Sequence, residues 1–292
     1  MFRFIAVVAC TISATLLAGC HAFPDTQRAR NAVVPLNHLP ALEGDYFRLD
    51  STNVGRPFHI YVRFPPEYAR HPDTRYPVVY LLDGDSLFPI LAANHLFLNY
   101  DEGVPEAIVV GIAYGSFDPA TNKRGYDFSA PGADAEAGQG GAPAFLGFLK
   151  NELIPTVEAR YRTNPARRIL FGQSRGGYFV LYSAFTDPDL FWGRIASNPP
   201  FAPGRARFYS EPSASADASS GLVVTSGTRD RPANRGEVLT WAKSWADKQK
   251  PWALKVADIE GGTHAANSVD SYRLGLIWLF DRVHELHRSP SP

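Results

Sequence analysis

The chain has 292 residues, of which 45% are hydrophobic and 13% aromatic, and this composition excludes an intrinsically disordered protein. Its 29 basic and 29 acidic residues give a formal net charge of zero, so the cationic surplus that nucleic-acid binding requires is missing. Only two cysteines occur, Cys10 and Cys20, which excludes a disulfide framework and a cysteine-based zinc site.

The N-terminal residues have the pattern of a bacterial lipoprotein signal. Arg3 supplies a positive charge, and residues 4–17 form an uncharged apolar stretch that is short for a transmembrane helix. The sequence Leu-Ala-Gly-Cys then ends at Cys20 and resembles the lipobox, in which cleavage precedes the cysteine and its thiol receives diacylglycerol. We therefore predict a signal peptide at residues 1–19 and a lipid on Cys20. The alternative is an ordinary signal peptide with a cysteine there by chance.

The lipid would place the protein in the bacterial cell envelope, anchored to a membrane on its periplasmic side. His21 follows the cysteine in place of the aspartate that usually signals inner-membrane retention, which favours the outer membrane. The next residues lack periodicity and include Pro24, Pro35 and Pro40. Residues 20–43 are therefore predicted to be a tether, and residues 44–288 to be the folded domain.

Strand-like and helix-like segments alternate from residue 44 onward. Several strands are apolar on both faces, which predicts an α/β fold with a mainly parallel sheet flanked by helices, and ligands bind beyond the carboxyl ends of such strands. Strands are expected at 57–64, 77–82, 106–112, 168–172, 221–226 and 252–257, helices at 87–100, 145–161 with a kink or restart at Pro155, 178–185, 238–245 and 269–283, and loops at 115–143, beside the site, and 210–220.

The strongest local motif is the G-x-S-x-G sequence at residues 172–176. It lies between a predicted strand and a predicted helix, as a nucleophile elbow does, where small neighbours permit the sharp turn that exposes Ser174. Chance matches to this motif are common, but the strand-turn-helix context favours the elbow.

A serine nucleophile requires a base, and the base requires a group that orients it. His264 directly follows the last predicted strand, which is the position of the base in α/β-hydrolases. Asp230 follows the strand at 221–226 and is the expected acid. Glu237 and Asp258 are alternatives, and Asp230 could instead pair with a neighbouring arginine at the surface.

An oxyanion hole requires two backbone N–H groups. Arg175 follows the nucleophile and is expected to donate one of them. Asp85 lies in the turn after the strand at 77–82 and is expected to donate the other, with Gly84 allowing the backbone to approach the substrate. The alternative for this Asp-Gly-Asp sequence is a simple β-turn.

These features together resemble the putative esterase family of α/β-hydrolases, which includes esterase D, the mycolyltransferase antigens and the enterochelin-type siderophore esterases. The resemblance extends over about residues 45–284 and is greatest to the siderophore-esterase branch, where a similar Arg-x-x-Asp element precedes the nucleophile. The matching segments are 76–84, 124–128, 145–149, 152–155, 172–177 and 261–264.

The resemblance implies an α/β-hydrolase fold and a small-molecule ester substrate. In the family, the residue after Leu-Asp-Gly lends an oxyanion N–H, which supports the role of Asp85. Two departures are visible. Asp230 stands where many relatives carry glutamate, and Asn198, followed by two prolines, stands where a Ser-Pro-Ser type of sequence is usual.

The sequence thus predicts a serine esterase in which Ser174 attacks, His264 acts as the base and Asp230 orients it, with no metal or organic cofactor. An acyltransferase using the same residues and a non-catalytic lipoprotein that binds an envelope ligand are the alternatives. A siderophore lactone, a cell-wall-linked acyl ester and a small xenobiotic ester all stay open as substrates, and no oligomeric state is predicted.

Overall fold

The computed structural model describes residues 39–215, 217 and 219–288, all of which belong to one compact unit, Leu36–Pro292. The predicted signal peptide, Cys20 and most of the predicted tether lie outside the described residues. The end of that tether is folded, because Pro40–Leu42 form a short 3-10 turn in which Leu42 is buried. Within the described ranges, no helix is both long and apolar enough to cross a membrane.

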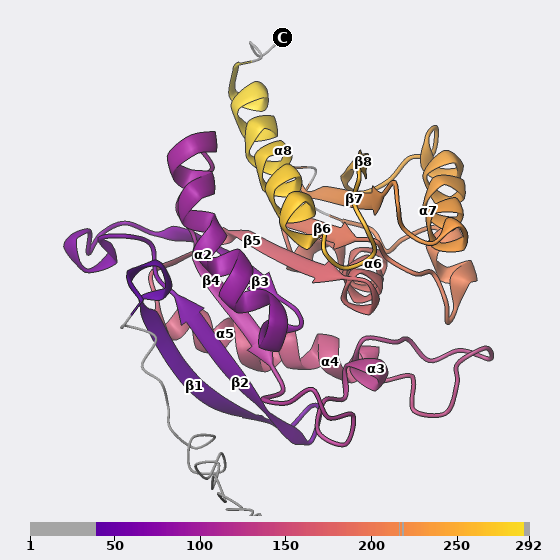
Figure 1. Cartoon of the computed structure of the whole chain (residues 1–292), viewed down its shortest axis with the longest axis horizontal. Helices are drawn as coiled ribbons and strands as arrows, with labels where there is room; N and C mark the ends of the chain where they lie inside the picture. The colour runs from indigo at the N-terminus through magenta and orange to yellow at the C-terminus, as the bar shows by residue number, and fades with distance from the viewer. Residues whose placement is uncertain (1–38, 216, 218, 289–292) are drawn as a thin grey trace, which may run out of the picture. The chain divides into compact units, whose positions relative to one another are not determined.

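A single sheet of eight strands organises the described part of the chain, in the order β1-β2-β4-β3-β5-β6-β7-β8 (Figure 1). β2 pairs antiparallel with both β1 and β4, and all other neighbours are parallel. The prediction of a mainly parallel sheet is therefore confirmed. The strands are β1 (Gly44–Ser51), β2 (Arg56–Arg63), β3 (Tyr76–Leu81), β4 (Ile108–Ala113), β5 (Thr163–Gln173), β6 (Gly193–Ser197), β7 (Gly221–Gly227) and β8 (Ala253–Ile259).

Helices cover both faces of the sheet, and each face has its own apolar core. Alternate residues of β3 show the division, since Val78 and Tyr80 pack in one core and Val79 and Leu81 in the other. α2 and α8 cover the second core, and α4 to α7 cover the first. The helices are α2 (Gly84–Glu102), α3 (Arg124–Asp127), α4 (Ala142–Phe148), α5 (Ile154–Arg160), α6 (Arg175–Thr186), α7 (Pro232–Trp245) and α8 (Ser268–Arg288).

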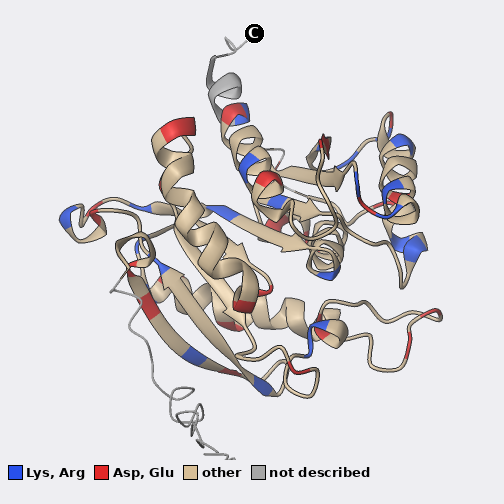
Figure 2. Ribbon diagram, in the orientation of Figure 1, with Lys and Arg blue, Asp and Glu red and all other residues tan. Residues whose placement is uncertain are grey.

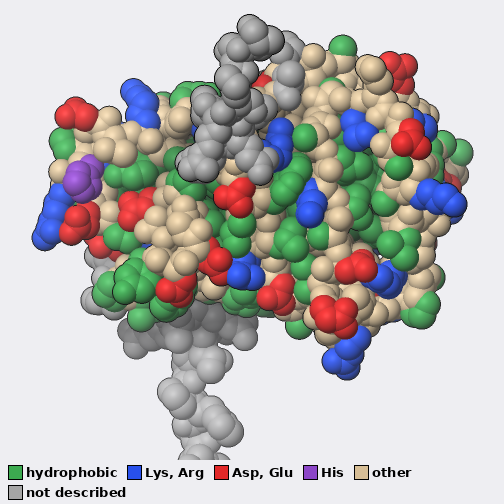
Figure 3. Space-filling model, turned by 90° about the horizontal axis from the view of Figure 1, so that it is seen from above, with side chains coloured by type: hydrophobic (Ala, Val, Ile, Leu, Met, Phe, Trp, Pro, Cys, Tyr) green, Lys and Arg blue, Asp and Glu red, His purple; other side chains and the backbone are tan. Residues whose placement is uncertain are grey.

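Basic and acidic residues are both scattered along the ribbon (Figure 2). The face seen in Figure 3 likewise mixes hydrophobic, basic and acidic side chains. This distribution agrees with the zero net charge of the sequence.

Two strands, β1 and β6, were not predicted. The apolar pattern of β6 is interrupted by Arg194, which is fully buried in the structure. Its guanidinium donates hydrogen bonds to the carbonyl oxygens of Pro188, Phe191 and Asp187 and to the hydroxyl of Ser183. Burial lowers the pKa of Arg194 to about 9. A buried polar group that is satisfied in this way is compatible with a core strand, but its partners are not apparent from the sequence.

The helical segment predicted at 145–161 restarts at its proline. α4 ends at Phe148, a π-helical turn follows over Leu149–Leu153, and α5 begins at Ile154 with Pro155 in its first turn. Proline is tolerated there because the first N–H groups of a helix have no intrahelical acceptor.

The π-helical turn is tied to the turn between β1 and β2 by Glu152. Its Oε1 atom accepts hydrogen bonds from the backbone N–H groups of Thr52 and Asn53, both at 3.0 Å, and from both of their side chains. Burial by itself would raise the pKa of Glu152, but hydrogen bonds from Ser51, Thr52 and Asn53 outweigh it and lower the pKa to about 2.

Glu152→Gln is expected to lower the free energy of unfolding at pH 7 by about 1 kcal/mol, because a neutral amide is a weaker acceptor and the site is partly solvated. The pKa of Glu152 in the folded protein lies below the ordinary glutamate value of 4.5. The carboxylate's contribution is therefore complete above about pH 4.5 and is lost as the pH falls towards 2. Urea unfolding of wild type and Glu152→Gln between pH 7 and 3 measures the difference in their free energies of unfolding. A difference that stays constant or grows as the pH falls would contradict this linkage.

Candidate active site

The three residues predicted to act together lie at the same edge of the sheet. β5 ends one residue before Ser174, β7 ends three residues before Asp230, and β8 ends five residues before His264. These strands are parallel and belong to the run β5-β6-β7-β8, so their carboxyl ends meet at one edge. This is the edge at which ligands bind in such sheets.

Ser174 occupies a strained turn between β5 and α6. Its backbone has φ 55° and ψ −116°, outside the regions that a non-glycine residue usually adopts. A Cβ atom at Gly172 would come within 2.4 Å of the carbonyl carbon and oxygen of Gly176, so the turn requires glycine there. The Ser174 N–H donates to the Ser197 oxygen at 2.8 Å. The local geometry is that of the predicted nucleophile elbow.

The structure brings Ser174, His264 and Asp230 into one hydrogen-bonded line. His264 Nε2 lies 2.8 Å from Ser174 Oγ, and His264 Nδ1 lies 3.0 Å from each carboxylate oxygen of Asp230. The Asp230 side chain is 1% exposed and the His264 side chain 31%. In this arrangement a neutral imidazole can accept the serine proton at Nε2 while its Nδ1–H donates to the carboxylate.

The alternative carboxylates pair with arginines. Asp258 accepts two hydrogen bonds from Arg235, at 2.7 and 2.8 Å, and Glu237 lies 3.3 Å from Arg205. Asp230 does contact a neighbouring arginine, but through the backbone N–H of Arg231 at 2.6 Å, in addition to its contact with His264. Of the three candidate carboxylates, Asp230 is the one hydrogen-bonded to the histidine.

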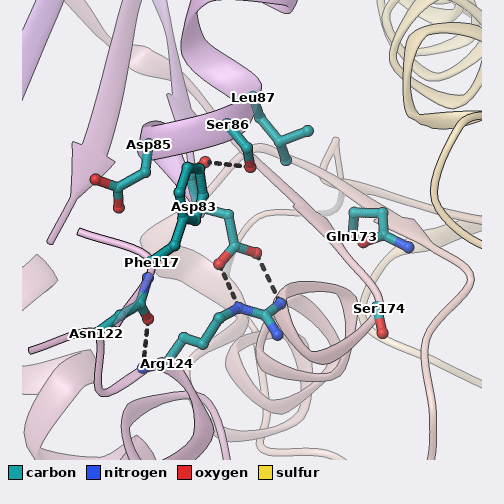
Figure 4. Close-up of a pocket in the computed structure, with 9 residues that line it drawn as sticks. All are labelled: Asp83, Asp85, Ser86, Leu87, Phe117, Asn122, Arg124, Gln173 and Ser174. Carbon is teal, nitrogen blue, oxygen red and sulfur yellow. Dashed lines mark hydrogen bonds and ion pairs between the residues drawn. The ribbon is translucent and has the colours of Figure 1, made fainter. Parts of the chain in front are cut away.

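A cavity of about 260 Å³ opens beside Ser174. Figure 4 shows Ser174 and Gln173 at one side of it and the first turn of α2 at the other. Among the described residues, no three His, Cys, Asp or Glu side chains gather so that they could hold a metal ion. The cavity is lined by Asp83, Asp85, Ser86, Leu87, Phe117, Asn122, Arg124, Gln173 and Ser174.

A bidentate ion pair forms the floor of this cavity (Figure 4). Arg124 Nε lies 2.5 Å from Asp83 Oδ1, and Arg124 Nη2 lies 2.9 Å from Asp83 Oδ2. Both residues belong to segments on which the family resemblance rests, but their pairing was not predicted. Such pairs have a fixed planar geometry, so this one holds α3 against the start of α2.

The two predicted oxyanion donors lie at helix starts beside the cavity: Asp85 lines it, and Arg175 directly follows Ser174, which lines it too. Arg175 is the first residue of α6 and Asp85 the second residue of α2. N–H groups at a helix start have no acceptor within the helix and carry partial positive charge. The Asp85 carboxylate points away from Ser174 (Figure 4) and accepts the backbone N–H groups of Tyr114 and Gly115 at 2.8 and 2.7 Å. The Asp85 carboxylate is thus bound to that segment and does not face Ser174.

The environment of Asp85 is less favourable to its charge than water. Burial raises its pKa, the N–H groups of Tyr114 and Gly115 oppose that shift, and the charge of Asp83 adds to it. Gly84 lies directly against β4. A Cβ atom there would come within 2.8 Å of the Ile112 nitrogen, so glycine is required by close packing of α2 on β4.

A second cavity, of about 660 Å³, shares Phe117, Asn122 and Arg124 with the first. Its walls come mainly from the segment 115–143, which is predicted to be a loop beside the site. In the structure this segment also contains the short helix α3 and the start of α4. The other lining residues are Arg56, Pro119, Lys123, Gly125, Tyr126 and Gly138.

Comparison with known proteins identifies related esterases. A model of the family described as "Putative esterase" matches residues 51–277. The ferri-bacillibactin esterase BesA of Bacillus subtilis is 34% identical over 52% of this chain and 56% of its own. The siderophore triacetylfusarinine C esterase of Aspergillus fumigatus is 33% identical over 55% of this chain and 57% of its own. The chain thus spans slightly more than half the length of these relatives.

Solved structures share the fold. The BES protein from Bacillus cereus superposes with a TM-score of 0.70 at 24% identity, covering 80% of this chain and 94% of its own. An IroE-like serine hydrolase from Shewanella oneidensis superposes with a TM-score of 0.69 at 24% identity, covering 82% of this chain and 80% of its own. At these identities the likeness supports the α/β-hydrolase fold alone. The family model covers most of the chain, and the chain therefore belongs to the putative esterase family.

Proposed function

We propose that this protein is a serine carboxylic-ester hydrolase. The observation that carries the proposal is the line from Ser174 Oγ to His264 Nε2 at 2.8 Å and from His264 Nδ1 to Asp230 at 3.0 Å, located on a strained strand-to-helix turn. Hydrogen-bonded nucleophile, base and orienting carboxylate are the arrangement that activates a serine hydroxyl.

In the proposed reaction, Ser174 Oγ attacks the ester carbonyl carbon while His264 Nε2 takes the hydroxyl proton. The charge of Asp230 stabilises the imidazolium. As the tetrahedral intermediate collapses, the bond to the alcohol breaks and His264 returns the proton to that alcohol. Water then attacks the acyl-enzyme, with His264 again acting as base, and releases the acid and free Ser174.

The negative oxygen of the tetrahedral intermediate is proposed to accept hydrogen bonds from the backbone N–H groups of Arg175 and Asp85. Both are at helix starts; Asp85 lines the cavity beside Ser174, and Arg175 is the residue that follows Ser174. Preorganised donors of this kind stabilise charge that develops only in the transition state.

We further propose siderophore or envelope-related esters as the substrate class. The named relatives act on ferri-bacillibactin and on triacetylfusarinine C. The two adjoining cavities, of about 260 and 660 Å³, give room for a large acyl or alcohol group beside Ser174.

A hydrolysis screen tests the proposal. The protein is incubated with siderophore, short-chain and aromatic esters, and with a fluorophosphonate probe whose attachment site is mapped. We expect ester turnover and labelling at Ser174. Absence of both would contradict the proposal and favour a binding protein, whereas acyl transfer to an added alcohol in preference to water would favour an acyltransferase.

For the location, we propose that Cys20 carries lipid and anchors the protein in the bacterial envelope, with the outer membrane favoured. The support is the Leu-Ala-Gly-Cys sequence after the apolar stretch. Several acyl chains bind a membrane far more strongly than a single chain. Labelling with radioactive palmitate in the native host should be lost in Cys20→Ser, and equal labelling of both proteins would refute the anchor.

A further inference from the structure

Asn198 occupies a central position that the proposed chemistry does not use. It directly follows β6, is 1% exposed, and has φ 44°, in the left-handed region that asparagine tolerates better than most residues. It is also the residue that replaces serine in the expected Ser-Pro-Ser type of sequence. β6 lies between the strand that ends at the elbow and the strand that leads to Asp230.

The side-chain amide of Asn198 bridges the two loops that carry Asp230 and His264. Its Oδ1 accepts the backbone N–H of Gly227 at 2.8 Å. Its Nδ2 donates to the His264 oxygen at 2.7 Å and approaches the Thr263 oxygen at 3.2 Å. The orientation of the amide follows from its partners, because a backbone N–H can only donate and a carbonyl oxygen can only accept.

These contacts of Asn198 are made either to the backbone of a triad residue or to the backbone of a residue that is bonded to one. Gly227, held by the Asn198 oxygen, accepts the backbone N–H of Asp230 at 3.0 Å. The His264 oxygen is held by Asn198 and also by Gln173 Nε2 at 2.5 Å. The residue before Asn198 accepts the Ser174 N–H. One short segment therefore contacts the loops of nucleophile, acid and base.

We infer that Asn198 is a positioning residue that sets the place of His264 and Asp230 relative to Ser174. The inference rests on the proposed function, because it concerns the geometry of the same triad. Without Asn198, the His264 carbonyl would keep only its bond from Gln173, so the histidine loop would be freer to shift. A displacement of about 1 Å of a catalytic group can lower a rate roughly 100-fold.

A different explanation is that asparagine is required only for its backbone conformation. Asn198→Gly separates the two explanations, because glycine adopts positive φ without steric strain and removes all of the side-chain contacts. The Asn198 side chain is not among the residues that line the substrate cavity. A positioning role therefore predicts a loss in kcat with little change in KM.

The test compares wild type, Asn198→Gly, Asn198→Ser and Ser174→Ala with an ester that the wild type hydrolyses. For the variants that keep Ser174, rates are expressed per active site, counted by exhaustive fluorophosphonate labelling, so that a partly folded sample does not bias them. The rate of Ser174→Ala is expressed per protein. Asn99→Ala is the matched control, since it removes an asparagine bond to a backbone carbonyl, that of Val104, far along α2 from the cavity.

We expect Asn198→Gly to lower kcat and the labelling rate by the same factor, roughly 10- to 100-fold, with KM within about twofold of wild type. Asn198→Ser should lose less, because its hydroxyl has a single O–H donor and can replace only part of the contacts of the amide. It serves as the test if the glycine variant does not fold. Asn99→Ala should retain the wild-type kcat.

Two results would overturn the inference while leaving the proposed function intact. One is a wild-type per-site kcat in the Asn198 variants with Ser174→Ala inactive. The other is a raised KM at unchanged kcat, which would assign Asn198 to substrate binding. If instead the wild type neither turns over esters nor labels at Ser174, the proposed function fails and the inference fails with it.

Discussion

Ser174→Ala is expected to lower kcat for ester hydrolysis by about a millionfold, since loss of the nucleophile in a serine hydrolase abolishes the acyl-enzyme route. The fold should persist, because the backbone of the elbow is held by the Ser174 N–H bond to Ser197 and by the close approach of Gly172 to Gly176. Steady-state kinetics of the purified variant measures the loss in kcat, and circular dichroism measures whether the fold persists.

Ser244→Ala provides the matched serine control. The Ser244 hydroxyl bonds to the Trp241 oxygen within α7, so its removal should leave turnover unchanged. Residual activity in Ser174→Ala of more than a small fraction of wild type would exclude Ser174 as the nucleophile. That result would also require another explanation for the strained backbone at this position.

Asp230→Asn is expected to lower kcat by about ten-thousandfold if the three residues act as one unit. The amide keeps the shape of the side chain but removes the charge that stabilises the imidazolium, and it can hold His264 in the wrong tautomer. The Asp230 side chain is almost fully buried and contacts Nδ1 with both oxygens, so water cannot easily replace it. A smaller loss would mean that Ser174 and His264 act nearly as a dyad.

The other two carboxylates supply the comparison for that variant. Asp258→Asn and Glu237→Gln remove charges that pair with Arg235 and Arg205, so both should retain most of the activity. Wild-type turnover in Asp230→Asn together with a collapse in either of the others would reassign the acid. The assignment of Ser174 and His264 would survive that outcome.

Ser174 and His264 could be proposed from the sequence because each follows a recognisable strand. The elbow at Ser174 could be recognised because its turn needs glycine at position 172, and all the residues of the turn are consecutive in the sequence. His264 and Asp230 could be proposed because the carboxyl ends of parallel strands lie at one edge of the sheet. The order of strands and helices along the chain was sufficient for this inference.

Contacts between distant segments could not be read from the pattern of residues. The three candidate carboxylates are distinguished only by their partners in the fold. Asp258 and Glu237 pair with arginines, and Asp230 is hydrogen-bonded to the histidine. The ion pair of Asp83 with Arg124 joins residues 41 positions apart. No periodicity records such a pairing, because it arises only when helix and loop are folded against each other.

The local sequence determined the strands and helices whose apolar residues recur at the spacing of a strand or a helix. It also determined the strand-turn-helix unit that exposes Ser174. Tertiary structure determined β6, whose buried Arg194 is stable only because four surrounding residues accept its hydrogen bonds. It also determined the bridge from Asn198 to the loops of Asp230 and His264. The physical reason is the same in both cases: burial of a polar side chain is costly unless partners from elsewhere in the chain meet it.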